Sequence, residues 1–103
     1  MKPFRFTLGA YAQIAQIYGH IATDNPQAAE KVVKRIESVA ALLGEQPHIG
    51  HKLRYRSERV FPVKPYPYLI FYRLAGGRVH ITRIRHAARR RPALQEPAME
   101  FRR

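Results

Sequence analysis

The chain has no cysteine, few acidic residues and no long apolar run. Without cysteine there is neither a disulfide framework nor a thiolate metal site, and the composition suits a reducing compartment. No apolar stretch approaches the roughly 20 residues that span a bilayer. Met1 leads into an alternating pattern rather than into the apolar block of a signal peptide. We therefore expect a cytoplasmic protein that makes no use of a membrane.

Positive charge dominates the composition and is unevenly spread. The 103 residues include 19 Lys and Arg against 7 Asp and Glu, a formal net charge of +12. Residues 1–50 contribute a net charge of +1, and residues 51–103 contribute +11. Such a field attracts phosphate backbones, acidic protein surfaces and anionic membranes alike, so it does not by itself specify a partner.

The first part of the chain predicts a strand followed by a helix. Apolar and polar residues alternate over Phe4–Leu8, which predicts a half-buried strand ending at Gly9. From Ala10 the apolar residues recur at spacings of three and four, which predicts an amphipathic helix ending near Thr23. Its apolar stripe consists of Ile14, Ile17 and Ile21, with Tyr11 and Tyr18 along the margin.

A second helix is predicted directly afterwards. Asn25 suits the N-cap, and Pro26 suits the first helical position, where a missing N–H costs little. Gly44 lies where a C-terminal cap is expected. Two amphipathic helices joined this closely predict an antiparallel helical hairpin. The apolar face of the second helix consists of Ala29, Val32, Val33, Ile36, Val39, Ala40 and Leu43.

The second half predicts strands. Residues 46–56 show no periodicity and are interpreted as a loop, and Arg59–Val63 predicts a short strand that its proline restricts to an edge or a bulge. An aromatic and aliphatic run with Gly76-Gly77 behind it predicts a β-hairpin with strands at 68–73 and 78–86. Ile81 and Ile84 differ in parity, which requires either burial on both faces or a bulge near Thr82 or Arg83.

Together these elements predict the α+β class. The expected fold has an N-terminal strand and an antiparallel helical hairpin packed on a small, mainly antiparallel sheet that ends in a C-terminal β-hairpin. We expect a single domain over residues 1–91 and a flexible tail over residues 92–103.

The candidate chemistry lies in arginines and one histidine near the strand ends. The five histidines lack companion ligands at metal-binding spacings, so we expect neither a metal nor another cofactor. The basic cluster supports two interpretations: metal-free ribonucleolytic cleavage with His86 as the titrating group, or docking onto an acidic or nucleic-acid surface. Its members are Arg59, Arg73, Arg83, Arg85, His86, Arg89, Arg90 and Arg91.

Four stretches in order resemble one family. They are Ala28-Ala29 after Asp24-Asn25-Pro26, Pro47-x-x-Gly50, the run from Tyr66 to Arg73, and Ile84-Arg-His-Ala-Ala-Arg-Arg90. The chain resembles the RelE/ParE superfamily of bacterial toxin–antitoxin toxins, and the ParE branch in particular, from about Phe4 to Arg90. The resemblance implies a strand, a helical hairpin and a three-stranded antiparallel run.

The superfamily has two activities. RelE-like members are ribosome-dependent mRNA endonucleases, whereas ParE-like members are known for inhibiting DNA gyrase. Phe61, Tyr68 and Ala88 occupy positions near which the ribonuclease branch places basic residues. The resemblance therefore favours a non-enzymatic gyrase inhibitor whose target-binding residues are Arg59, Arg73, Arg83, His86, Arg89 and Arg90. The alternative is an mRNA interferase that acts on the ribosome and uses His86, Arg83 and Arg89.

The resemblance also implies a protein partner. Toxins of this kind are neutralised by a small cognate antitoxin in a hetero-oligomer, and an acidic antitoxin segment would offset the charge of +12. There are two candidate binding positions for such a segment, the helical hairpin and a sheet edge. For the hairpin, the expected antitoxin-binding residues are Ile14, Ile17, Tyr18, Ile21 and Val33.

Overall fold

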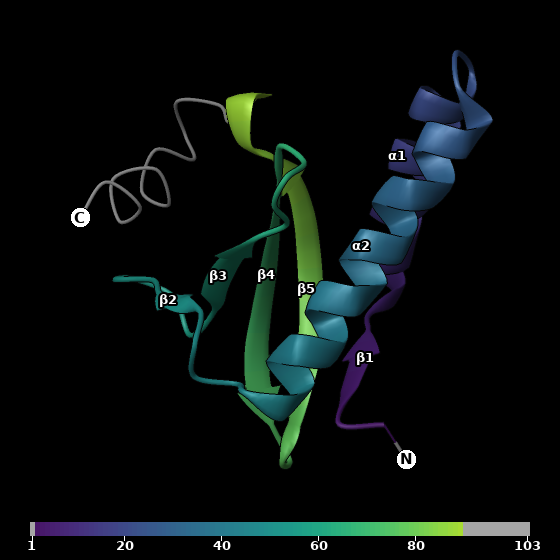
Figure 1. The fold of residues 1–103 in the computed structure, drawn as a ribbon. Helices are drawn as coiled ribbons and strands as arrows, with labels where there is room; N and C mark the ends of the chain where they lie inside the picture. Colours follow the sequence, from purple (N-terminus) through teal and green to yellow (C-terminus); the bar gives the residue numbers. More distant parts are fainter. Residues whose placement is uncertain (1, 90–103) are drawn as a thin grey trace.

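The computed structural model describes residues 2–89 and has the predicted α+β architecture. Two helices lie side by side over one face of a five-stranded sheet (Figure 1). The strand order is β1-β5-β4-β3-β2; β1 and β5 are parallel, and every other pairing is antiparallel. The elements are β1 (Phe4–Phe6), α1 (Leu8–Ala22), α2 (Pro26–Glu45), β2 (His51–Lys52), β3 (Arg59–Pro62), β4 (Tyr68–Ala75), β5 (Arg78–His86) and the 3₁₀ helix η1 (Ala87–Arg89). The last residues of the predicted domain and the predicted tail lie outside the described range.

The first helix begins two residues earlier than the sequence predicts. The Thr7 side chain accepts a hydrogen bond from the Ala10 backbone N–H at 3.2 Å and caps the helix. Leu8 is therefore in the first helical turn and is 85% exposed, so its prediction as a strand residue was wrong. The strand ends at Phe6, although the sequence alternation continues to Leu8, because Thr7 caps α1 and the helix begins at the next residue.

The second helix begins as predicted and ends differently. Asn25 Oδ1 accepts from the Ala28 N–H at 3.1 Å, and Pro26 is the first helical residue. Gly44 lies inside the last turn, and Gln46 is the C-cap, so Gly44 was wrongly predicted as the cap. A Cβ at Gly44 would lie 3.0 Å from Pro3, which indicates that this glycine allows the start of β1 to approach the helix closely.

The C-terminal hairpin confirms its prediction and settles the question of parity. Gly76 and Gly77 have φ values of 60° and 72°, which a two-residue hairpin turn requires. The β4–β5 register shifts between Phe71 and Tyr72, and Thr82 is the extra residue on β5. Because of this bulge, Ile81 and Ile84 both join the core beneath the helices.

The loop predicted over residues 46–56 contains a strand that the sequence does not reveal. β2 consists of two residues only, His51 and Lys52, and pairs with Val60 and Arg59. So short a strand has no periodicity to detect. Pro62 lies in the half of β3 that β2 does not reach, which agrees with its predicted place at an open edge.

The sheet separates two apolar clusters. The larger cluster lies between the sheet and the helices; it includes Ile36, Leu43, Ile70, Tyr72 and Ile81, all fully buried. The smaller cluster lies on the opposite face. It consists of Leu53, Val60, Leu69 and Phe71, with Ala87 packed against it. Within residues 2–89, no helix is long and apolar enough to cross a membrane.

Candidate functional site

The sheet face turned away from the helices carries a row of arginines. Arg73 of β4 pairs with His80, and Arg83 and Arg85 of β5 pair with Phe71 and Leu69. Directly paired residues share a face, and Phe71 and Leu69 belong to the cluster opposite the helices. Arg5 of β1 also pairs with His80 and so shares this face. We call the surface formed by Arg5, Arg73, Arg83 and Arg85 the arginine face.

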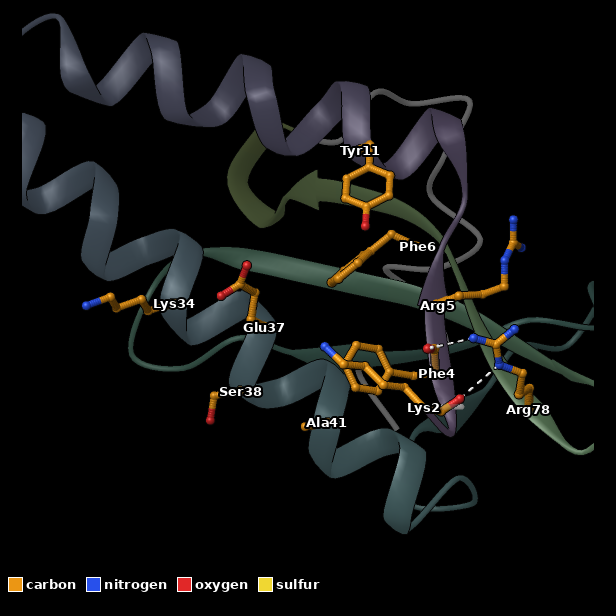
Figure 2. Close-up of a pocket in the computed structure, with 10 residues that line it drawn as sticks. All are labelled: Lys2, Phe4, Arg5, Phe6, Tyr11, Lys34, Glu37, Ser38, Ala41 and Arg78. Carbon is orange, nitrogen blue, oxygen red and sulfur yellow. Dashed lines mark hydrogen bonds between the residues drawn. The ribbon is translucent and has the colours of Figure 1, made fainter.

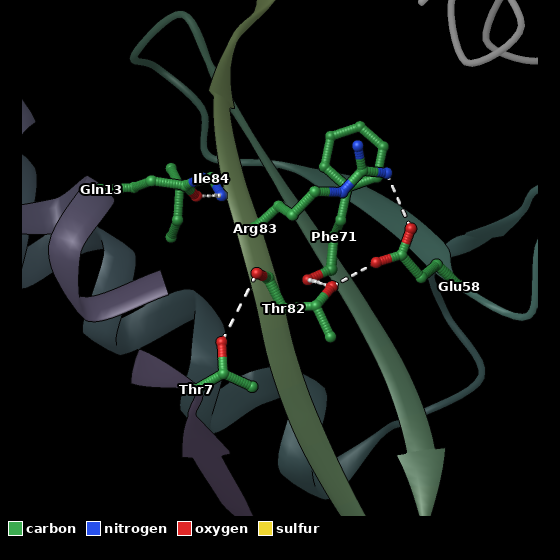
Figure 3. Close-up of polar contacts among 7 residues, drawn as sticks. All are labelled: Thr7, Gln13, Glu58, Phe71, Thr82, Arg83 and Ile84. Carbon is green, nitrogen blue, oxygen red and sulfur yellow. Dashed lines mark hydrogen bonds and ion pairs between the residues drawn. The ribbon is translucent and has the colours of Figure 1, made fainter. Parts of the chain in front are cut away.

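Glu58 organises the middle of the arginine face (Figure 3). Its Oε1 accepts from Arg83 Nη2 at 2.7 Å, and the two side chains are only 13% and 17% exposed. The Arg83 guanidinium lies over the Phe71 ring, 4.2 Å from its centroid. Arg83 is therefore fixed by a carboxylate and an aromatic ring at once.

The β-bulge belongs to the same arrangement. The Thr82 hydroxyl faces two acceptors, the Phe71 carbonyl at 3.1 Å and the other carboxylate oxygen of Glu58. On the helix side of β5, Gln13 Oε1 accepts from the Ile84 N–H at 2.6 Å. Polar side chains from α1 and from the segment before β3 thus hold β5 beside its irregular residue (Figure 3).

Arg85 adds positive charge to a crowded site. Burial lowers the pKa of the Arg85 guanidinium, and the neighbouring Arg83 lowers this pKa further, while Glu58 acts in the opposite direction. Between residues 51 and 89 the sequence has ten Lys and Arg and one acid, which is Glu58. An anion reaching this surface would relieve repulsion between guanidinium groups.

His86 lies on the other face of the sheet. It pairs with Tyr68, and the two rings meet edge to face with centroids 5.3 Å apart. Its Nδ1 accepts from the Ala88 N–H at 3.1 Å, so in this arrangement Nε2 carries the proton. Arg83 and His86, both named for the ribonuclease alternative, therefore lie on opposite faces. Of Arg89, the third residue, only the backbone in η1 is described.

Arg59 supports a loop. Its Nη1 donates to the Gly50 carbonyl at 2.9 Å and to the His48 carbonyl at 3.3 Å. Tyr72 holds the same loop, since its hydroxyl donates to the Pro47 carbonyl and accepts from the Gly50 N–H, both at 2.9 Å. Burial raises the pKa of the Tyr72 hydroxyl above its usual value. Of the predicted target-binding set, Arg73 and Arg83 share the arginine face, Arg59 and His86 do not, and Arg90 lies outside the described residues.

A groove of about 940 Å³ opens along the free edge of β1 (Figure 2). Phe4, Phe6 and Tyr11 form its aromatic wall, with Phe6 and Tyr11 ring centroids 5.4 Å apart. The basic side chains that line it outnumber the one acid, Glu37. These basic residues are Lys2, Arg5, Lys34 and Arg78.

The edge of β1 in this groove has backbone groups directed outward. The Pro3 carbonyl and the Thr7 N–H form hydrogen bonds with β5. In a parallel pair, the backbone groups of successive residues point alternately toward and away from the partner strand, so the N–H and C=O groups of Phe4 and Phe6 point to the open side. Arg78 closes part of that edge, since its Nη2 donates to the Phe4 carbonyl at 3.4 Å and its Nε to the Lys2 carbonyl at 2.9 Å. The rest of the edge offers backbone groups to a further strand.

The residues predicted to bind an antitoxin differ in accessibility. Ile14, Ile17 and Ile21 pack against the main core and are partly buried, as is Val33. Tyr18 is 38% exposed. Tyr11, one helical heptad before Tyr18, is 58% exposed and also lines the groove. Tyr18 thus lies on the same stripe of α1 as Tyr11, which lines the groove. No group of three or more His, Asp or Glu within residues 2–89 is arranged to hold a metal ion.

Comparison with known families identifies the chain. Residues 4–91 match the family described as ParE toxin of type II toxin–antitoxin system, parDE. The chain belongs to this ParE toxin family. The match covers both helices and all strands of the described residues, the arginine face, and every residue that lines the groove except Lys2.

Individual relatives agree with that assignment. Toxin RelE2 of Caulobacter vibrioides is 40% identical over 84 residues, which is 82% of this chain and 93% of RelE2. Putative toxin Y4kP of Sinorhizobium fredii is 35% identical over 91 residues, 88% of this chain and 94% of Y4kP. A solved structure, described as the chromosomal ParDE TA system from P. aeruginosa, has a TM-score of 0.73 at 24% identity. The match covers 84% of this chain and 96% of the chain in that structure, and it confirms the fold described above.

The sequence analysis did not single out Glu58, which the structure places in the middle of the arginine face. Glu58 is the one acid in the basic half up to residue 89, and that isolation was a signal available in the sequence.

Proposed function

We propose that this ParE-family toxin inhibits DNA gyrase by binding it, without catalysing a reaction, and that a cognate antitoxin neutralises it. Family membership is the reason for proposing gyrase as the target, since gyrase inhibition is the activity for which ParE-like toxins are known. The supporting observation is the arginine face, on which Arg73 is exposed and Arg83 is held in place by Glu58. We expect Arg73, Arg83, His86, Arg89 and Arg90 to contact the target.

A supercoiling assay with charge-reversal variants tests the face. Arg73→Glu should weaken inhibition of gyrase at least tenfold, since it places an acid among arginines that face an anionic target surface. Lys31→Glu makes the same charge change on the exposed side of α2, away from the arginine face, and should leave inhibition unchanged. Equal inhibition by the parent chain and Arg73→Glu would remove the arginine face from the proposal.

The mRNA interferase alternative has one observation in its favour, the similarity to a protein named RelE2. It requires His86 and Arg83 to act on one phosphate, although these residues lie on opposite sheet faces. Ribosome-dependent cleavage of a message that His86→Ala abolishes would support this alternative.

We propose that the antitoxin occupies the groove at β1 and the adjoining side of α1. Its groove segment would be acidic, to match Lys2, Lys34 and Arg78, and extended, to pair with the open edge of β1. Continuing past Tyr11, the antitoxin would reach Tyr18 and the accessible parts of Ile14, Ile17, Ile21 and Val33. We expect the pair to form in the cytoplasm as a hetero-oligomer.

Two neighbouring lysines on α2 provide a matched test of the groove. Lys34 lines the groove and Lys31 does not, and both are exposed. Lys34→Glu should weaken antitoxin binding by roughly two- to tenfold, as expected for an exposed charge at an interface rim, whereas Lys31→Glu should not. The same loss of antitoxin affinity in both variants would indicate that net charge attracts the antitoxin and that it does not bind in the groove.

A further inference from the structure

The segment Leu53–Glu58, which we call the basic loop, is anchored at both ends and exposed at its tip. The Leu53 N–H donates to the Glu58 carbonyl at 3.1 Å and closes the loop. Leu53 is 2% exposed in the smaller cluster, and Glu58 is bound to Arg83 and Thr82 of β5. These anchors attach the loop to the arginine face.

Between the anchors the chain presents Arg54, Tyr55, Arg56 and Ser57, all exposed. Tyr55 is 74% exposed, although burying an aromatic side chain is favourable, and no buried cluster includes it. The Arg54 guanidinium lies 5.9 Å from the Tyr55 ring centroid. The tip of the basic loop therefore presents an exposed aromatic ring together with the guanidinium groups of the arginines on either side of it in the sequence.

We propose that the basic loop binds single-stranded nucleic acid. Tyr55 would stack on an unpaired base, and Arg54 and Arg56 would bind the phosphates on either side, which is how aromatic and basic side chains combine in single-strand binding. Glu58, by joining the loop to Arg83, lets a strand that leaves the loop pass over the arginine face. This inference goes beyond gyrase inhibition and does not depend on it.

The choice of a single strand over other anions follows from the ring. A duplex keeps its bases stacked on one another and offers the loop only phosphates, whereas an unpaired base offers a face of the size that Tyr55 exposes. An acidic peptide would match the charge and leave the ring without a stacking partner. The experiment below therefore separates ring-dependent from charge-dependent binding.

The test is fluorescence anisotropy of a labelled 20-nucleotide oligothymidine with the full chain and no gyrase. Tyr55→Ala should weaken binding roughly tenfold, and Tyr55→Phe, which keeps the ring, should bind as the parent does. The Arg54→Gln/Arg56→Gln variant should reduce the slope of log K against log salt by about 1.4, that is about 0.7 for each phosphate contact. Lys31→Gln/Arg35→Gln removes the same charge from the exposed side of α2 and should not change that slope.

Three results would overturn the inference. The first is equal affinity of Tyr55→Ala and Tyr55→Phe for the oligonucleotide. The second is an equal loss of slope in the loop and α2 double variants, which would indicate diffuse attraction. The third is binding of poly-glutamate with the same dependence on Tyr55, which would make the loop a protein contact. Matching thermal unfolding curves confirm that each variant is folded. Failure to inhibit gyrase, together with intact oligonucleotide binding, would contradict the proposed function and leave this inference in place.

Discussion

Glu58 and Arg83 form an ion pair of 2.7 Å across the sheet face that the helices leave open, with less than a fifth of either side chain exposed. The pair joins the end of the basic loop to the middle of β5. The only acid between residues 51 and 89 is therefore committed to holding a cation in place. A basic surface with a fixed arginine presents a defined shape to a partner, whereas long free side chains must first be ordered.

The first prediction concerns this pair. Glu58→Gln should lower the free energy of unfolding by about 1–3 kcal/mol, because a partly buried guanidinium loses its charged acceptor. The urea midpoint at neutral pH measures the change. Glu37→Gln is the control: Glu37 is exposed on α2, and its replacement should alter stability by less than about 0.5 kcal/mol. Equal midpoints for the two variants would show that the ion pair does not stabilise the fold.

A second prediction concerns the loop that precedes β2. In Gly50→Ala the new Cβ would overlap the Tyr72 hydroxyl, which the Gly50 N–H binds. We expect a destabilisation of about 1–3 kcal/mol, typical of overpacking, measured by urea unfolding. Gly19→Ala provides the opposite case, since no atom outside the local backbone of α1 lies within 4 Å of its Cβ position, near the C-terminal end of that helix. That change should stabilise the chain by about 0.5–1 kcal/mol, and a gain at both sites would contradict the packing at Gly50.

A third prediction concerns the dependence of stability on pH. Burial raises the pKa of Tyr72, so the unfolded chain ionises this residue first, near pH 10. The contribution of the protonated hydroxyl is complete below about pH 10 and is lost as the pH rises toward the folded-state pKa. Tyr72→Phe lacks this contribution and leaves the Gly50 N–H and Pro47 carbonyl without their partner.

Urea unfolding of the parent chain and Tyr72→Phe, compared from about pH 8 to pH 11, measures this effect. The stability difference should be about 1–3 kcal/mol at the lower pH and should shrink at the upper end. Ionisation of the other tyrosines and of lysines occurs in both chains and cancels in the comparison. A difference that stays constant or grows with pH would contradict the assigned direction of the pKa shift.

The sequence predicted the architecture because its signals are local. The cap at Asn25, the glycine turn and the uninterrupted apolar run of β4 are each contained in a few residues, and the structure confirms them. The bulge at Thr82 was one of two options, and in the structure the Thr82 hydroxyl contacts Glu58, which lies 24 residues earlier. A local pattern cannot contain such a contact.

The site was less predictable than the fold. Arg59 and Arg73 are equally basic in the sequence, yet one holds a loop carbonyl and the other is exposed on the arginine face. His86 and Arg83 are three residues apart, and the bulge and the strand pairing decide that they lie on opposite faces. Net charge identified the basic half correctly, but which arginines bind a partner depends on contacts between distant segments.

The most direct measurement of the central claim is DNA supercoiling by purified gyrase with this chain added, run beside ribosome-dependent cleavage of a defined message in the same buffer. The account predicts loss of supercoiling with trapped cleaved DNA, and an intact message. Cut message with unaffected gyrase would contradict it and would transfer His86 and its neighbouring arginines from binding to catalysis.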